Sequence, residues 1–132
     1  MYEVRIHGRG GQGAVLAAQL LATALVFDGK YAVSIPAFGF ERRGAPVVSF
    51  IRASEAPIRQ LTNIYAPDCI ICVDPTLART VDIFAGLKPG GAMVQATSPA
   101  REDVAVAATV GTVGLCDAVR TATEISAPPA TK

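Results

Sequence analysis

Charged side chains and aromatic rings are scarce in this chain of 132 residues. Lys, Arg, Asp and Glu make up 17% of it and aromatic residues 6%, with no tryptophan, whereas ordinary soluble domains are about 25% charged. The net charge of +1 lacks the basic excess typical of nucleic-acid binders. The longest apolar stretch, Ala14–Phe27, is about 14 residues, short of the ~20 that span a bilayer. We therefore expect neither nucleic-acid binding nor a membrane span.

Signal-peptide features are also missing, because the first residues, MYEVRIHG, show no basic start followed by an apolar run. Hydrophobic residues make up 51% of the chain, which excludes intrinsic disorder. The length suits one compact domain, which we expect over residues 1–126 with a tail at 127–132. With so few charged residues, the surface of the domain should be apolar in part, which suggests that partner chains cover it there.

Cysteines are few: Cys69, Cys72 and Cys116. An odd number without a signal peptide favours a reduced, cytoplasmic protein. Cys69 and Cys72 form a C-x-x-C pattern, but they lie in CIICV, which is typical of a buried strand. Side chains three residues apart on a strand point to opposite faces. We therefore expect these thiols to be core residues and not metal ligands, and we expect no iron–sulfur cluster on this chain.

The first half of the sequence predicts a β–α–β unit. Residues 3–7 alternate as in a strand, residues 14–28 form a strong helix, and residues 31–36 form a second strand. This order indicates an α/β fold with a mainly parallel sheet and a right-handed crossover. The helix is apolar almost all round, so we expect it to be covered on both sides.

Further elements follow a loop at residues 37–46. We expect strands at 47–53, 68–73 and 92–97, and one more short strand within 104–113. Asp74 is a good N-cap and Pro75 suits the first helical position, which predicts a helix from there to about Phe84. A short helix is expected at 117–125.

A glycine-rich turn, GRGGQG at residues 8–13, joins the first strand to the first helix. It satisfies G-x-G-x-x-G in the context that the motif requires. Glycines let the backbone approach a ligand, and the exposed N–H groups with the helix dipole favour an anion. Arg9 and Gln12 would add side-chain donors. The alternative is a tight turn whose glycines only allow close packing.

Binding of NAD or FAD is the obvious interpretation, but the second strand does not support it. Dinucleotide sites place an Asp or Glu roughly 20 residues after the glycines, at the end of that strand, to hold the ribose. Residues 33–36 are VSIP and contain no acid. The turn is therefore a candidate site for a phosphate or pyrophosphate, and the sequence disfavours a nicotinamide dinucleotide as the ligand.

A second candidate loop, FGFERRGAP at residues 38–46, follows the second strand at its carboxyl end. In open α/β sheets the ligand crevice lies outside these ends, so we expect this loop to lie near the glycine-rich turn. Arg42 and Arg43 would bind an anionic ligand or an acidic patch on a partner. A solvated charged loop is the alternative.

Five segments together resemble one family: HGRGGQGAV (7–15), FGFERRGAPVVSFIR (38–52), PIR (57–59), IYAPD (64–68) and VDPTL (73–77). The chain is similar to the gamma subunit of 2-oxoacid:ferredoxin oxidoreductases, most like the pyruvate type. The resemblance covers roughly residues 2–100, in order. It thins beyond that, and typical gamma subunits run on for several tens of residues past the position of Lys132.

The resemblance implies a Rossmann-like, three-layer α/β domain within a multisubunit enzyme. Such enzymes oxidatively decarboxylate a 2-oxoacid to an acyl-CoA. Thiamine diphosphate with Mg²⁺ and the [4Fe–4S] clusters belong to partner alpha, beta and ferredoxin-like delta subunits, and ferredoxin accepts the electrons. The gamma subunit is associated with coenzyme A and with assembly.

The resemblance also implies which residues form the coenzyme A site, and it implies no catalytic residue and no metal ligand on this chain. The candidates lie in the two loops: Gly8, Arg9, Gly10, Gly11, Gln12, Gly13, Arg42, Arg43 and Gly44. Two alternatives stay open. One is an interaction subunit without a small-molecule site, and the other is a stand-alone nucleotide-binding enzyme.

Overall fold

The structure, a computed structural model, describes residues 1–37, 44–96 and 107–126. Two helices, one 3-10 helix (η1) and six strands follow one another along these residues. In chain order they are β1 (Tyr2–Arg9), α1 (Ala14–Phe27), β2 (Tyr31–Pro36), β3 (Pro46–Ser54), β4 (Cys69–Cys72), η1 (Pro75–Arg79), β5 (Gly91–Ala96), β6 (Val110–Cys116) and α2 (Ala118–Ser126). The first strand, first helix and second strand lie where the sequence predicted them.

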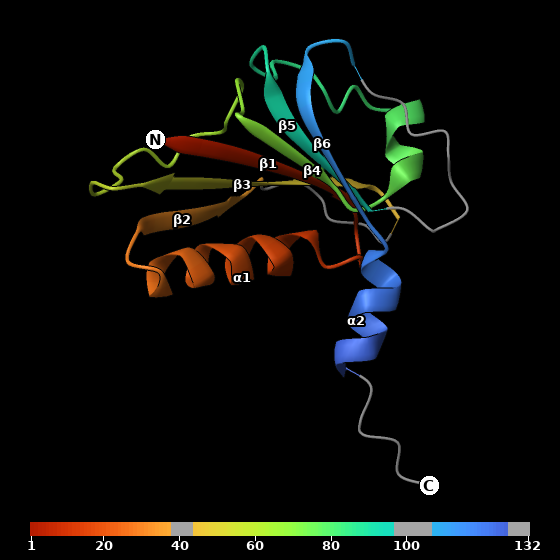
Figure 1. The fold of residues 1–132 in the computed structure, drawn as a ribbon, viewed down its shortest axis with the longest axis horizontal. Helices are drawn as coiled ribbons and strands as arrows, with labels where there is room; N and C mark the ends of the chain where they lie inside the picture. The colour runs from red at the N-terminus through yellow and green to blue at the C-terminus, as the bar shows by residue number, and fades with distance from the viewer. Residues whose placement is uncertain (38–43, 97–106, 127–132) are drawn as a thin grey trace, which may run out of the picture.

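The strands form a single sheet in the order β2-β3-β1-β4-β5-β6 (Figure 1). The neighbours from β1 to β6 pair in parallel, whereas β3 is antiparallel to both β1 and β2. The mainly parallel α/β sheet is thus confirmed. The β1–α1–β2 unit, however, does not place β2 beside β1, because β3 lies between them. Antiparallel strands need only a short connection, and β3 follows β2 closely in the chain.

Two predicted elements differ from the structure. The helix expected from Pro75 to Phe84 ends after η1 at Arg79 and is followed by turns. Asp82 explains part of this, because its carboxylate accepts the Phe84 N–H at 3.1 Å and so offers the backbone a non-helical partner. The strand expected within 104–113 begins only at Val110. Residues 104–106, like the tail at 127–132, lie outside the described part.

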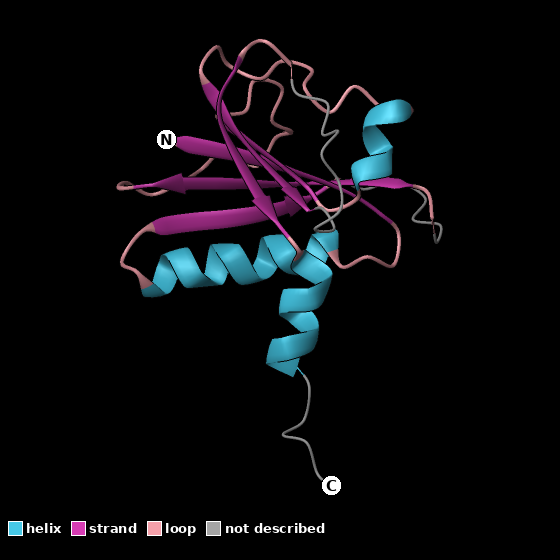
Figure 2. Cartoon of the chain, turned by 45° about the vertical axis from the view of Figure 1, so that its right-hand side comes forward, coloured by secondary structure: helices cyan, strands magenta, loops and turns pink. Residues whose placement is uncertain are grey.

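Each face of the sheet carries its own hydrophobic cluster. On one face α1 packs its small residues Ala14, Ala18 and Ala22 against β1, β2 and β3, in a cluster that also includes Cys69 of β4. On the other face Leu77 and Ile83, from residues 75–88 (called the η1 segment below), pack against β4 and β5. The arrangement has three layers, because α1 lies on one side of the sheet and the η1 segment on the other (Figure 2). Cys69 belongs to the first cluster and Cys72 to the second, which confirms that the two thiols point to opposite faces.

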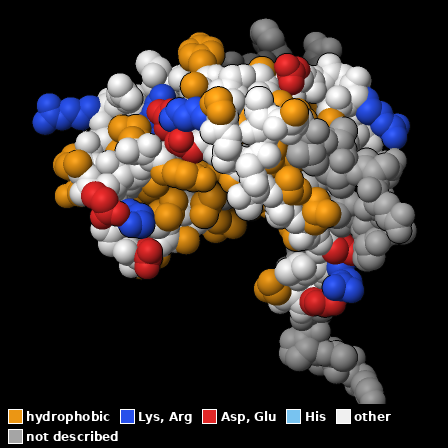
Figure 3. Space-filling view, turned by 45° about the horizontal axis from the view of Figure 1, so that its top comes forward, with side chains coloured by type: hydrophobic (Ala, Val, Ile, Leu, Met, Phe, Trp, Pro, Cys, Tyr) orange, Lys and Arg blue, Asp and Glu red, His pale blue; other side chains and the backbone are white. Residues whose placement is uncertain are grey.

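The outer side of α1 is exposed in this chain. Large apolar side chains there are 54–88% accessible: Leu16, Leu20, Val26 and Phe27. The described residues of this chain therefore cover α1 on one side only. Cover of its other side, by a partner chain, stays a prediction. Figure 3 shows one face of the molecule, on which hydrophobic side chains are scattered and form one larger group in its lower left part. None of the described helices is long and apolar enough to cross a membrane.

The sheet face opposite α1 holds a buried Arg–His pair. Arg5 Nε donates to His7 Nε2 at 2.9 Å, and the Arg5 guanidinium also donates to the carbonyls of Ile83 and Ala85. Burial first, and then the charge of Arg5, lower the pKa of His7 to about 4. His7 is thus a neutral acceptor that orients Arg5, and Arg5 fastens the η1 segment to the sheet.

The neutral His7 predicts a pH-dependent stability. An unfolded chain titrates its histidine near 6.5, so between pH 6.5 and 4 the unfolded state binds the extra proton. Stability is therefore complete above pH 6.5 and falls by about 3 kcal/mol as the pH drops to 4. Urea unfolding at pH 7, 5.5 and 4 measures it. The His7→Gln variant removes the only histidine and should lose this slope; an unchanged slope contradicts the assignment.

Candidate functional site

The turn between β1 and α1 lies at the carboxyl edge of the parallel strands. Gly8 allows three elements to meet there, because a Cβ at this position would lie 2.6 Å from Val73 Cγ2 and 3.0 Å from the Ala14 Cβ. Its role is close packing of β1, the end of β4 and the start of α1. At Gly8 the structure therefore supports the alternative interpretation of the motif, in which the glycine allows close packing.

Gly11 and Gly13 are needed for backbone conformation. Their φ angles are 87° and 82°, in the left-handed region that side chains disfavour. The turn closes with a hydrogen bond from Gln12 N to Arg9 O at 3.1 Å. A Cβ on Gly13 would have no atom within 4 Å, so the space beside it is open.

The N-terminus of α1 opens onto a hollow. Gly13 is the N-cap, no described side chain caps the helix, and its first turn carries no acid. The N–H groups of the first turn have no acceptor within a helix and carry the positive end of its dipole. A hollow of about 400 Å³ adjoins them. Its lining is Arg9, Gly10, Gly11, Gly13, Ala14, Val15, Leu16, Gln19 and Val47.

The side chains of Arg9 and Gln12 are engaged with Asp74, just after β4. Arg9 Nε lies 3.2 Å from Asp74 Oδ2, and Gln12 Nε2 donates to the same oxygen at 2.8 Å. Gln12 Oε1 accepts the Arg9 N–H at 2.7 Å. The sequence predicted both side chains as donors to a bound anion; in the structure Gln12 donates to a carboxylate of the protein and Arg9 forms an ion pair with it.

The second predicted loop meets the first at Gly44. Gly10 N donates to Ala45 O at 2.8 Å and Gly44 N donates to Gly10 O at 3.1 Å, while Arg9 Nη1 donates to Gly44 O at 3.0 Å. The expected proximity of the two loops is therefore present at these residues. Arg42 and Arg43, also predicted for the site, lie outside the described residues.

Sequence reasoning identified Asp74 only as a helix cap and missed it as part of the site. The cap is real, because Asp74 Oδ1 accepts the Thr76 N–H at 2.8 Å. Burial raises the pKa of Asp74, but hydrogen bonds from Thr76 and Gln12 and the charge of Arg9 outweigh it and lower that pKa. Its position after a buried strand was the available signal, since the carboxyl ends of parallel strands share one edge.

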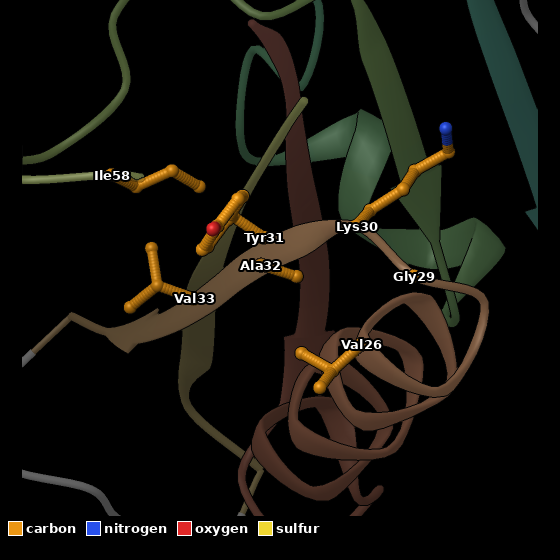
Figure 4. Close-up of a pocket in the computed structure, with 7 residues that line it drawn as sticks. All are labelled: Val26, Gly29, Lys30, Tyr31, Ala32, Val33 and Ile58. Atoms are coloured by element: carbon orange, nitrogen blue, oxygen red, sulfur yellow. The ribbon is translucent and has the colours of Figure 1, made fainter. Parts of the chain in front are cut away.

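A second hollow, of about 360 Å³, lies at the other end of α1 (Figure 4). Its lining is mostly aliphatic: Val26, Gly29, Lys30, Tyr31, Ala32, Val33 and Ile58. Figure 4 shows Lys30 extending away from the other labelled side chains, and its ammonium pairs with Glu55. Without backbone donors at a helix start, this hollow is the weaker candidate for an anion.

Reactive groups are sparse across the part of the chain that the structure describes. Those residues contain no cluster of three or more His, Cys, Asp or Glu side chains able to hold a metal ion. Burial raises the pKa of both Cys69 and Cys72, so these thiols stay protonated. The geometry therefore supports binding of an anionic group at the α1 start.

Comparison with known proteins gives a consistent group. The family model described as "Pyruvate ferredoxin/flavodoxin oxidoreductase" matches residues 3–132. The NADH-dependent phenylglyoxylate dehydrogenase subunit gamma of Aromatoleum evansii is 66% identical over 99% of this chain and 69% of its own length. The pyruvate/ketoisovalerate oxidoreductases common subunit gamma of Thermococcus kodakarensis is 48% identical over 99% of this chain and 72% of its own.

Solved structures share the fold. Pyruvate oxidoreductase subunit PORC from Thermotoga maritima superposes with a TM-score of 0.73 at 34% identity, over 93% of this chain and 65% of that one. The 2-oxoglutarate:ferredoxin oxidoreductase from Magnetococcus marinus, solved with coenzyme A and succinyl-CoA bound, has a TM-score of 0.67 at 21% identity, over 94% of this chain and 21% of that one. This chain thus spans just under two thirds of the first structure's length.

Proposed function

Because the chain belongs to the pyruvate ferredoxin/flavodoxin oxidoreductase family, as a subunit of the gamma type, we propose that it contributes the coenzyme A contact of a 2-oxoacid oxidoreductase complex. The complex would oxidatively decarboxylate a 2-oxoacid to an acyl-CoA in the cytoplasm. The observation that carries the proposal is the uncapped start of α1 facing the hollow beside Gly11 and Gly13.

Coenzyme A suits this site chemically, because its pyrophosphate and 3′-phosphate are anions that backbone N–H groups at a helix start bind well. The redox groups fit this chain poorly. Cys69 and Cys72 lie on opposite sheet faces, so they cannot jointly hold a cluster. We propose, as the family resemblance implies, that thiamine diphosphate, Mg²⁺ and the [4Fe–4S] clusters lie on alpha, beta and delta partners, with ferredoxin as the acceptor.

Under this proposal, other subunits of the complex determine which 2-oxoacid is the substrate. The Thermococcus relative is named as a subunit common to pyruvate and ketoisovalerate oxidoreductases, and the Aromatoleum relative belongs to a phenylglyoxylate dehydrogenase. Gamma chains of similar sequence thus accompany different substrates. That supports a shared task for the gamma chain, and coenzyme A is the reactant that such reactions share.

Gln19→Glu tests the site with a nearly isosteric change. Gln19 lines the hollow one turn into α1, so its carboxylate would repel a bound phosphate. A like charge about 6 Å away in a partly screened site costs on the order of 1.4 kcal/mol, so we expect roughly tenfold weaker coenzyme A binding. Titration calorimetry of the assembled complex with coenzyme A measures it.

Thr23→Glu is the matched control, because it adds the same charge on an exposed part of α1 outside the hollow. Its coenzyme A affinity should equal that of the wild type. Equal affinity in Gln19→Glu as well would leave only the alternative of an interaction subunit. The exposed apolar side of α1, with Leu20 and Phe27, supports a role in subunit contact. Such a contact is compatible with coenzyme A binding at the other end of the helix.

A further inference from the structure

Three segments that are distant in the sequence are joined by one side chain at the carboxyl edge of the sheet. Arg9 belongs to the end of β1. Its Nη1 donates to Gly44 O at 3.0 Å, its Nη2 to Thr76 Oγ1 at 3.3 Å, and its Nε pairs with Asp74 at 3.2 Å. The guanidinium thus links the glycine-rich turn, the loop before β3 and the turn after β4.

The carboxylate of Asp74 is engaged at both oxygens by this arrangement. Oδ1 accepts the N–H of Thr76 at 2.8 Å and its hydroxyl at 2.6 Å. Oδ2 accepts Gln12 Nε2 at 2.8 Å and faces Arg9 Nε at 3.2 Å. An ionised carboxylate offers about four acceptor positions; these three hydrogen bonds use three of them, and Arg9 Nε faces the carboxylate as an ion pair. The side chain of Asp74 is only 12% exposed, which makes it an internal anchor.

Gln12 is held at both ends of its amide. Its oxygen accepts the Arg9 N–H at 2.7 Å and its nitrogen donates to Asp74 at 2.8 Å. A ligand that took either group would have to break a bond that shapes the turn. The backbone of Gly11 and Gly13 lines the hollow, together with Arg9, Gly10 and the start of α1.

We propose that Arg9, Gln12 and Asp74 form a clasp that positions the turn, and that the ligand's phosphate meets the backbone N–H groups instead of Arg9. The proposal rests on the coenzyme A role proposed above. Arg9 and Asp74 are then positioning residues with the same effect. If Arg9 instead bound the phosphate directly, Asp74 would be its competitor and the two residues would have opposite effects.

The signs of two alanine variants separate these cases. We expect Arg9→Ala and Asp74→Ala each to raise the KM for coenzyme A in the assembled complex about tenfold, with kcat at saturating coenzyme A within twofold of wild type. The double variant should be no worse than either single variant, because both break one unit. A lower KM in Asp74→Ala, or additive effects, overturns the clasp.

Two conservative variants keep the test valid if the alanine variants fail to fold. Asp74→Asn keeps an acceptor for Thr76 N–H but loses the charge that holds Arg9, and we expect a KM raised about threefold. Arg9→Lys keeps the charge but lacks the planar fork that reaches Gly44 and Thr76 together, so it should not restore the wild-type KM. A wild-type KM in either variant contradicts the proposal.

Hydrogen exchange tests the clasp without coenzyme A. The N–H groups of Gly10 and Gly44 are bonded across the two loops, so both should exchange several-fold faster in Asp74→Asn than in the wild-type complex. Unchanged exchange overturns the clasp. If exchange accelerates but Gln19→Glu leaves coenzyme A binding intact, the clasp stands and the coenzyme A role fails.

Discussion

Gly86→Ala is expected to destabilise the protein by more than about 4 kcal/mol, the range reserved for severe core damage. A Cβ at Gly86 would lie 1.8 Å from the carbonyl oxygen of Tyr65 and 3.0 Å from its carbon. Both are backbone atoms, so no side-chain rotation relieves the overlap. The φ of 75° adds the strain of a left-handed residue.

Gly90→Ala is the matched control for this variant. Its φ of 76° is nearly the same, but a Cβ there would have no atom within 4 Å. It should therefore cost only the conformational strain, about 1–2 kcal/mol. Urea unfolding of the two variants and the wild type at pH 7 measures both losses. Equal losses would show that the contact with Tyr65 is not what requires Gly86.

Such damage would reach the η1 segment, because Gly86 follows the residues that Arg5 binds. Arg5 donates to Ile83 O and Ala85 O, and Lys88 N donates to Pro67 O at 3.1 Å. Displacing Gly86 from Tyr65 would strain the hydrogen bonds of Arg5 and the hydrogen bond between Lys88 and Pro67. The second hydrophobic cluster, with Leu77 and Ile83, would lose its cover on the sheet.

Arg52→Met should cost about 3 kcal/mol, because it leaves a partly buried carboxylate and several carbonyls without their donor. Arg52, on β3, is only 3% exposed. Its Nε pairs with Glu3 at 3.0 Å. Its Nη groups donate to the carbonyls of Gln60, Thr62 and Asn63. The guanidinium of Arg52 thus bonds the irregular segment after β3 to the sheet.

Arg59→Met, in the same irregular segment, is the control. Arg59 is exposed, so its replacement should change stability by less than about 0.5 kcal/mol. Arg52→Lys keeps the charge but cannot donate to all of these acceptors at once, and it should recover only part of the loss. Thermal unfolding of the three variants ranks them. If Arg52→Met were as stable as Arg59→Met, the segment would be held by other contacts.

Much of the fold was readable from local patterns. The alternation before Gly8 predicted β1, and the Ala- and Leu-rich run ending before Gly29 predicted α1, because period and turn residues act locally. The helix predicted to Phe84 ends at Arg79, in part because the Asp82 carboxylate accepts the Phe84 N–H and so favours a turn there. The place of β3 between β1 and β2 was not readable either, since strand order depends on long-range pairing.

The sequence by itself determined the glycine-rich turn, its place before a helix and the chemistry of an anion at such a site. It left open what Arg9 and Gln12 do. That was decided only by the tertiary structure, because Asp74 lies more than 60 residues away and reaches the turn when β4 pairs with β1. A side chain's partner depends on which groups the fold places within hydrogen-bonding distance, and in this fold that group is the carboxylate of Asp74.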